Sequence, residues 1–261
     1  MTEERDPGFH RTEDRGAVLQ DIAVGTRPPG RSRLPEYQWV YLWRWPLRVT
    51  HWVSAGTIVA LIVTGFYIGA PYFTTWGEAS SHFLMGWARF IHFTAAALIV
   101  SAAILRVYWL FAGNKYARWN ALLPVRGRDW RNLWKMLRYY FLVRQEDMPH
   151  YLGHHPLQQL SYTGLYAVVI VQIITGFAMY GLSNPGGLFH TAFGWVGPLF
   201  GGIQNARFLH HVLTWILLSF IPLHVYLAFR ADVLDWGVRG EMSSIFSGGR
   251  FVRTDIAFED E

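Results

Sequence analysis

The chain has 261 residues, of which 52% are hydrophobic, 17% aromatic and 16% charged, and its formal net charge is +5. This composition excludes an ordinary soluble domain and is typical of a small protein that crosses a membrane several times. Cysteine is absent, which excludes structural disulfides, cysteine-bound iron–sulfur clusters and covalent C-x-x-C-H haem attachment.

The N-terminal segment, residues 1–36, is polar and rich in Arg, Asp, Glu, Gly and Pro. A segment of this composition cannot bury a hydrophobic core, so we expect a disordered tail. It also lacks the apolar stretch of a cleaved secretory signal. Residues 37–48 mix Trp and Tyr with Arg, a combination typical of the membrane–water interface where a spanning helix begins.

Four long apolar stretches predict an all-α fold, a four-transmembrane-helix bundle. Each stretch exceeds the roughly 20 residues that cross a bilayer as a helix. The predicted spans are residues 47–70, 86–111, 157–182 and 207–230. Residues 37–240 would form this membrane domain, and residues 241–261 a C-terminal tail.

A helix of a different kind is predicted at residues 128–144, in the long basic connection between the second and third spans. Its apolar and aromatic residues recur at helical spacing with cations between them: Trp130, Leu133, Trp134, Leu137, Tyr140 and Phe141. This pattern indicates an amphipathic helix lying on the membrane surface. A helix packed on a soluble partner is the alternative.

The distribution of cations predicts the orientation in the membrane. Residues 1–48 and the connection 113–155 each carry eight Lys or Arg, whereas residues 71–85 and 183–206 carry none. The positive-inside rule therefore places both termini and the basic connection, including its amphipathic helix, on the cytoplasmic side of a bacterial inner membrane.

Two histidines share one face of the last predicted span. His210 and His224 are 14 residues apart, which is within about 40° of four full turns and a rise of roughly 21 Å. Polar rings inside a membrane span are costly unless they are paired or used. His211 points about 140° away from His224 on the same helix.

Helices that enter from alternate sides bring four histidines to two depths. His51 lies near the inner surface, as does His224. His92 lies near the outer surface, as does His210. Paired imidazoles are axial ligands of haem iron, and without cysteine the haem must be the non-covalent b type. The bundle is therefore predicted to hold two six-coordinate b haems, which transfer electrons and leave no open site for oxygen.

The remaining histidines fit no such pair and are predicted to be surface or loop residues: His10, His82, His150, His190 and His211. Two alternatives stay open for the paired ones. They could be unrelated buried histidines, each bonded to a neighbouring helix. The chain could also be a haem-free anchor or transporter.

A short motif occurs twice, as Thr64-Gly65-Phe66 and Thr175-Gly176-Phe177. Glycine at these positions would let a flat haem ring approach the backbone. Close packing of two helices through Gly65 and Gly176 is the alternative.

Over residues 37–240 the chain resembles the b-type cytochrome subunit of membrane-bound nickel–iron uptake hydrogenases, in the cytochrome b561 and hydrogenase-anchor superfamily. The motifs that carry the resemblance are Arg48-Val-Thr-His51-Trp52, Gly77-Glu78-Ala79, Arg89-Phe-Ile-His92-Phe93, Gly113-Asn114-Lys115-Tyr116, Gly153-His154-x-Pro156 and Arg207-x-x-His210-His211. The cytochromes of formate dehydrogenase and thiosulfate reductase share the four-helix plan, and they remain alternatives with a b561-type electron carrier.

The resemblance implies an electron path from hydrogen to a quinone. An outer iron–sulfur small subunit and a nickel–iron large subunit would supply electrons to the outer haem. The inner haem would then reduce ubiquinone or menaquinone. This chain would carry no hydrogen chemistry itself, and its partners would be these subunits, lipid and quinone, with no nucleic acid.

Some polar residues lie at the depths expected for the haem propionates and the quinone. Arg48, Arg106 and Arg230 are candidate propionate partners, because arginine pairs bidentately with carboxylates. Snorkelling to lipid headgroups is the alternative. His154, at the head of the third span, is a candidate for the quinone site.

Overall fold

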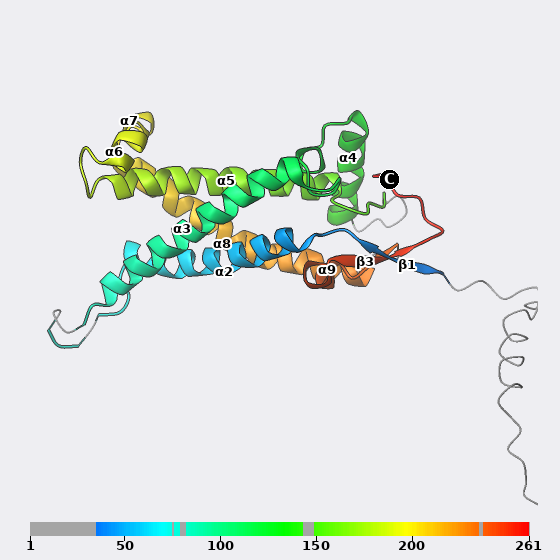
Figure 1. Ribbon diagram of the computed structural model, residues 1–261, viewed down its shortest axis with the longest axis horizontal. Coiled ribbons are helices and arrows are strands. Elements are labelled where there is room, and N and C mark those ends of the chain that lie inside the picture. The colour runs from blue at the N-terminus through cyan, green and yellow to red at the C-terminus, as the bar shows by residue number, and fades with distance from the viewer. Residues whose placement is uncertain (1–34, 75, 79–81, 143–148, 235–236, 261) are drawn as a thin grey trace, which may run out of the picture. The chain divides into compact units, whose positions relative to one another are not determined.

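Four long helices dominate the computed structural model, which describes residues 35–74, 76–78, 82–142, 149–234 and 237–260 (Figure 1). They are α2 (Trp45–Gly69), α3 (Leu84–Ala112), α5 (Pro156–Gly181) and α8 (Ile203–Leu234). Each is long and apolar enough to cross a membrane. The predicted all-α, four-span architecture is confirmed. Most of the predicted disordered tail, residues 1–34, lies outside the described residues.

The helix boundaries follow from local chemistry. Proline stands in the first turn of both α2 and α5, where its missing N–H costs nothing. At the start of α5, His155 and Gln158 form a reciprocal capping box, which satisfies two otherwise free N–H groups. Helix α8 runs four residues further at each end than the sequence predicts and continues through Pro222.

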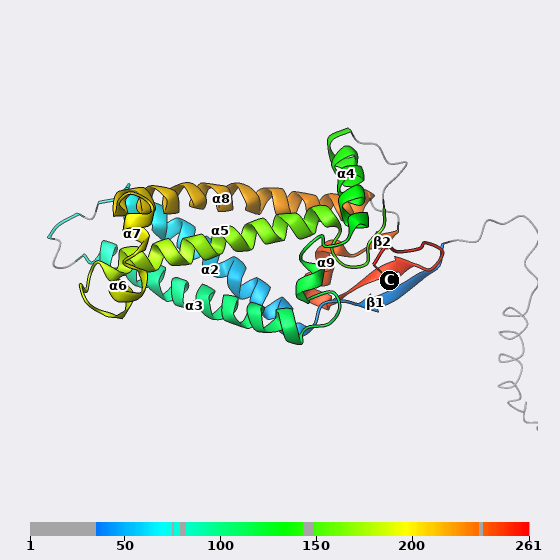
Figure 2. The ribbon, with the colours of Figure 1, turned by 90° about the horizontal axis from the view of Figure 1, so that it is seen from above.

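The four helices form two closely packed pairs, α2 with α3 and α5 with α8. Within the described residues, a helix of one pair does not pack as closely against a helix of the other pair as it does against its own partner. Side chains link the pairs instead, for example Phe66 of α2, whose ring lies 4.9 Å from that of Trp215 of α8. We call the boundary between the two helical hairpins the seam, and side chains such as those of Phe66 and Trp215 meet across it. Figure 2 shows how the four helices run beside one another.

One end of the bundle, the loop end, carries the connections 70–83 and 182–202 (Figure 1). The second connection contains two short helices, α6 (Leu188–Phe193) and α7 (Val196–Leu199). Val196 is fully buried against Ala178 and Ala206. These small residues of α5 and α8 let α7 pack closely, which explains why the segment is ordered.

The opposite end, the sheet end, carries a three-stranded antiparallel sheet in the order β1–β3–β2. Its elements are β1 (Tyr37–Tyr41), β2 (Val238–Arg239) and β3 (Gly249–Arg253), with α9 (Glu241–Ser247) between the last two. Residues 37–48 were expected to lie at the membrane interface and 241–261 to form a tail, so this pairing was missed. Each strand is too short to show a pattern without its distant partner.

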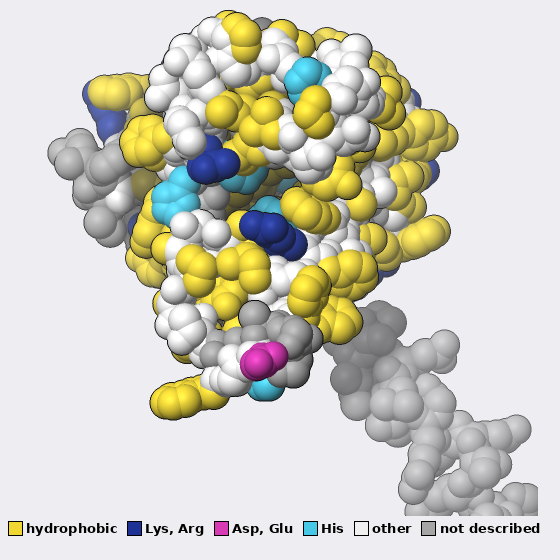
Figure 3. Space-filling view, turned by 90° about the vertical axis from the view of Figure 1, so that its left-hand side faces the viewer, with side chains coloured by type: hydrophobic (Ala, Val, Ile, Leu, Met, Phe, Trp, Pro, Cys, Tyr) yellow, Lys and Arg dark blue, Asp and Glu magenta, His cyan; other side chains and the backbone are white. Residues whose placement is uncertain are grey.

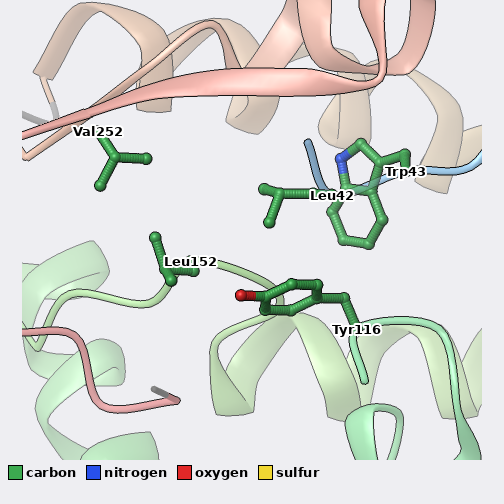
Figure 4. Close-up of a cluster of buried hydrophobic side chains, with 5 residues drawn as sticks. All are labelled: Leu42, Trp43, Tyr116, Leu152 and Val252. Atoms are coloured by element: carbon green, nitrogen blue, oxygen red, sulfur yellow. The ribbon is translucent and has the colours of Figure 1, made fainter. Parts of the chain in front are cut away.

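A compact hydrophobic cluster joins this sheet to the bundle (Figure 4). It contains Leu42 and Trp43 after β1, Tyr116 after α3, Leu152 before α5 and Val252 of β3. Four distant segments of the chain therefore meet at the sheet end.

The amphipathic helix is α4 (Gly127–Leu142), which follows the short 3-10 turn η1 (Trp119–Ala121). It runs across the long helices at the sheet end (Figure 2). Leu133, Met136 and Tyr139 are buried, whereas Trp130 and Trp134 are exposed. The helix agrees with the predicted range 128–144 as far as residue 142, and residues 143 and 144 lie outside the described part.

Candidate haem-binding sites

The histidines nearest the loop end are each held by a threonine of the preceding long helix. The Nδ1 atom of His92 on α3 lies 2.9 Å from the Oγ1 atom of Thr64 on α2. The Nδ1 atom of His210 on α8 lies 2.8 Å from the Oγ1 atom of Thr175 on α5. His92 and His210 also lie close enough to interact electrostatically, so the predicted outer pair is brought together.

The threonine hydroxyls determine which ring nitrogen is free. Thr64 donates its hydroxyl proton to the carbonyl of Ala60, at 2.6 Å, and Thr175 donates to the carbonyl of Val171, at 2.7 Å. Each hydroxyl oxygen therefore accepts from an Nδ1–H of the facing histidine. In a neutral imidazole with a protonated Nδ1, the Nε2 lone pair is free to bind a metal.

The glycine after each threonine makes room for the same histidine. A Cβ atom at Gly65 would lie 3.3 Å from Cε1 of His92, and one at Gly176 would lie 3.4 Å from Cε1 of His210. The sequence suggested that these glycines admit a haem or a neighbouring helix. The contact observed is with the histidine ring of the neighbouring helix, and approach by the haem itself stays a prediction.

The histidines nearest the sheet end face each other across the seam. The ring centroids of His51 on α2 and His224 on α8 are 6.3 Å apart, and the rings are inclined by 47°. A metal–imidazole bond is about 2 Å long, so two rings that share one ion have centroids roughly 6 Å apart. This pair therefore has the spacing of two axial ligands.

The surroundings of the sheet-end pair are aromatic rather than polar. Phe220 stacks on His224 with a centroid distance of 5.4 Å, and Trp52 contacts His51 edge-on at 5.3 Å. The Nδ1 atom of His51 is buried and has no hydrogen-bond partner among the described residues. The two histidine pairs thus share a geometry of facing helices but differ in their hydrogen bonding.

Comparison with known proteins identifies the family of this four-helix chain. Residues 42–247 match the prokaryotic cytochrome b561 family. The chain belongs to this family.

Several curated relatives extend over most of the chain. The probable Ni/Fe-hydrogenase B-type cytochrome subunit of Azotobacter chroococcum is 39% identical over 87% of this chain and 94% of its own length. The one from Cupriavidus necator is 40% identical over 80% of this chain and 86% of its own. The probable Ni/Fe-hydrogenase 1 B-type cytochrome subunit of Escherichia coli is 32% identical over 75% and 84%.

The described residues of this b561-family chain fit a b haem. Cysteine is absent from the sequence, so a haem in this chain is neither attached through cysteine nor bound by a thiolate. His92 and His210 present Nε2 as the free nitrogen, while His51 and His224 have the spacing of two ligands to one ion. Imidazole is the usual axial ligand in proteins that hold haem for electron transfer.

The candidate propionate arginines make contacts within the chain. Arg106 donates to the carbonyl of Ala117, at 3.0 Å, and to the hydroxyl of Tyr166, at 2.9 Å. Arg230 lies over the rings of two tyrosines of α4, and Arg48 donates to the carbonyl of Phe246. These contacts explain how the three side chains are held, and a role toward propionates stays a prediction.

His154 is held beside the sheet-end pair. Its ring lies 4.8 Å from that of Trp43 and 4.9 Å from that of Tyr162, which in turn lies 6.3 Å from His224. Part of the residue is exposed, but its Nδ1 atom is buried without a partner among the described residues. Burial, followed by the charges of Arg250 and Arg106, lowers the pKa of His154 to about 3.

The other histidines stay outside both pairs. His211 is exposed on α8 and its ring meets that of Phe66 at 5.4 Å, while His150 is partly buried against Phe258. His82 lies in the first loop and His190 on α6, and His10 lies outside the described residues. Pairing by depth thus separates the facing histidines from the rest.

Sequence reasoning missed three residues of these sites, Thr64, Thr175 and Tyr162. The repeated Thr-Gly-Phe motif held the signal for the first two, but its glycine drew attention and its threonine did not. Tyr162 had no signal, because a tyrosine in an aromatic-rich membrane protein is common.

Proposed function

We propose that this chain is the membrane-anchoring dihaem cytochrome b subunit of a nickel–iron hydrogenase. The four histidines would hold two b haems, one between His92 and His210 and one between His51 and His224. When bound, these haems would supply two one-electron stations across the membrane. The names of the relatives support the hydrogenase assignment.

The observation that carries this proposal is the separation of the histidines into two facing pairs. On α8, His210 and His224 are 14 residues apart, a rise of roughly 21 Å. Each faces one histidine of the other hairpin, at the loop end and at the sheet end respectively. One shared helix with two partnered histidines is the arrangement expected for a relay between the two sides of a membrane.

The loop end is the proposed docking face for the electron donor. Figure 3 shows hydrophobic side chains over much of this end, with basic side chains and histidines near its centre. Trp76 and Leu188 are 93% and 79% exposed. The two connections at this end carry no Lys or Arg, which supports an outer position in a bacterial inner membrane with the termini in the cytoplasm.

The sheet end is the proposed side of quinone reduction. His154 and Tyr162 lie in a chain of ring contacts that ends on His224. A buried imidazole with an unpartnered nitrogen can bond a quinone oxygen, and its low pKa keeps it neutral in that role.

The experiment that tests the proposal is haem quantification with reduced-minus-oxidised spectra on the full-length chain in membranes. We expect two haems per wild-type chain and one in His92→Ala. His211→Ala is the matched control, because His211 neighbours His210 on α8 but is exposed. Two haems should remain there. A colourless wild type, or equal loss in both variants, would refute the dihaem assignment.

A further inference from the structure

Each loop-end histidine is hydrogen-bonded to a threonine, whereas the Nδ1 atom of His51 at the sheet end has no partner among the described residues. The geometry points to Thr64 and Thr175 as positioning residues that lower the midpoint potential of the loop-end haem relative to the sheet-end haem. This inference rests on the proposed function, because it takes His92 and His210 as ligands of one haem. It adds a direction to the path, since a lower potential at the loop end favours electron transfer towards the sheet end.

The physical basis is the hydrogen bond behind each ligand. An imidazole that donates its Nδ1–H becomes a more basic ligand through Nε2. A more basic ligand stabilises the ferric state over the ferrous state, so the potential falls. The acceptor is itself polarised, because each threonine hydroxyl donates to a carbonyl on its own helix at 2.6 or 2.7 Å.

Both ligands of the loop-end pair receive this support. The distances are 2.9 Å for Thr64 to His92 and 2.8 Å for Thr175 to His210. Both threonines are buried, with 8% and 0% of their surface exposed. Water therefore competes little for the hydroxyl oxygens, and the two bonds persist as fixed features of the site.

The sheet-end pair lacks the same support among the described residues. The buried Nδ1 atom of His51 has no partner there. His224 is flanked by the rings of Phe220 and Tyr162, with no hydrogen bond to either of its nitrogens among the described residues. The effect of the threonines is thus confined to one of the two sites.

Bonding to the carbonyls of their own helix does not by itself explain why Thr64 and Thr175 face the histidines. Thr57 of α2 makes the same bond to its own helix, from Oγ1 to the carbonyl of Val53 at 2.8 Å, and it is also buried. It bonds no histidine among the described residues. Thr64 and Thr175 add a second bond to the helix of the next histidine, and each is followed by the glycine that admits that ring.

The test is a potentiometric titration of the haem absorbance in the full-length cytochrome. The variants are Thr64→Val, Thr175→Val and the double change, with Thr64→Ser and Thr175→Ser as rescues that keep the hydroxyl. Thr57→Val is the matched control. His92→Ala identifies the sheet-end haem as the component that remains.

Removing each bond should favour the ferrous over the ferric state by about three- to tenfold, which raises the loop-end potential by about 30 to 60 mV for a one-electron couple. The sheet-end potential should not move. The serine variants and Thr57→Val should titrate as the wild type. Loss of loop-end haem in the valine variants alone would also show that the hydroxyl is required.

Two results would overturn the inference while leaving the dihaem assignment intact. One is an unchanged or lower loop-end potential in the double valine variant with both haems bound. The other is the same haem loss in the serine and valine variants, because the positions would then serve packing alone. A wild type without two haems would instead refute the proposed function.

Discussion

The loop-end and sheet-end histidine pairs are built by different means. At the loop end, each histidine is hydrogen-bonded to a threonine of the preceding long helix in the same hairpin, and its ring lies close to the glycine that follows that threonine. At the sheet end, aromatic rings flank the pair, and Phe246 of α9 contacts Trp52, the residue after His51. The first site therefore depends on contacts within hairpins, and the second on contacts between residues about 200 positions apart.

The two histidine pairs are therefore held in place by different parts of the chain. At the sheet end, the ring of Trp52 of α2 lies 4.7 Å from that of Phe246 of α9, tilted by 33°, and Trp43 donates to the hydroxyl of Ser244 at 3.2 Å. The element α9 thus braces the helix that carries His51. Disturbing the sheet and α9 should loosen one histidine pair and spare the other.

Of the variants considered, Arg250→Ala should most strongly destabilise the sheet end. Arg250 is 4% exposed, forms a 2.7 Å ion pair with Glu241 and donates to the carbonyl of Leu152 at 3.2 Å. Removing one partner of a buried ion pair costs about 3 kcal/mol. We expect a lower Tm of the full-length protein by circular dichroism and selective loss of the haem assigned to His51 and His224.

The control for this change lies on the same strand. Arg253 pairs with Asp255 at 2.6 Å on the exposed surface, where such pairs contribute little. Arg253→Ala should leave the Tm and both haems unchanged. Equal loss of the two haems in Arg250→Ala would show that the ends are not independent.

The contrast between the two ends also explains what the sequence could predict. The spans and the amphipathic helix follow from periodicity and length, which are local properties, and the pairing of the four histidines was predicted from the alternating direction of the spans. The strands β1 and β3 pair Tyr37 with Arg253 and Tyr41 with Gly249, and no local pattern joins positions so far apart. The core of Leu42, Tyr116 and Leu152 was missed for the same reason.

The loop-end site shows a different limit. The two Thr-Gly-Phe steps were visible in the sequence, yet their partners depend on the rotation of neighbouring helices. The hydrogen bonds from His92 to Thr64 and from His210 to Thr175 link residues 28 and 35 positions apart. A repeated motif can therefore indicate a site before it indicates which atoms of the motif are used.

Substituting His154 should have an intermediate effect, a loss of quinone reduction with both haems still bound. Its pKa of about 3 keeps the ring neutral between pH 5 and 8, so it can bond a quinone but cannot deliver a proton as imidazolium. We expect His154→Ala to lower quinone reduction about tenfold, equivalent to one lost hydrogen bond, while both haems remain. His154→Gln, a neutral donor and acceptor, should retain more activity.

The pH dependence of stability tests the same neutral state. The folded pKa of His154 lies below the model-peptide value of 6.5, so only the unfolded chain takes up this proton as pH falls from 6.5 to 3. The stability of the wild type should therefore fall as the pH drops through that window. His154→Gln should show a shallower slope. A bell-shaped activity profile that vanishes in His154→Gln would instead assign it a proton-transfer role.

The smallest expected effect comes from the glycines of the loop end. In Gly65→Ala the new methyl group would lie 3.3 Å from Cε1 of His92, so the ring must move by a few tenths of an ångström. Alanine otherwise favours a helix over glycine by roughly 0.5–1 kcal/mol. The helix should therefore survive while the loop-end haem shows a shifted spectrum or lower occupancy.

Each of these glycines has a control on its own helix. Gly56 of α2 and Gly164 of α5 have nothing within 4 Å of a new Cβ atom. Gly56→Ala and Gly164→Ala should keep the wild-type spectrum and gain slightly in Tm, because only the helix preference changes. Gly176→Ala, with its 3.4 Å contact to His210, should resemble Gly65→Ala. If all four variants behaved alike, the glycines would serve the helices and not the histidine rings, and the distinction between the two ends would rest on the threonines alone.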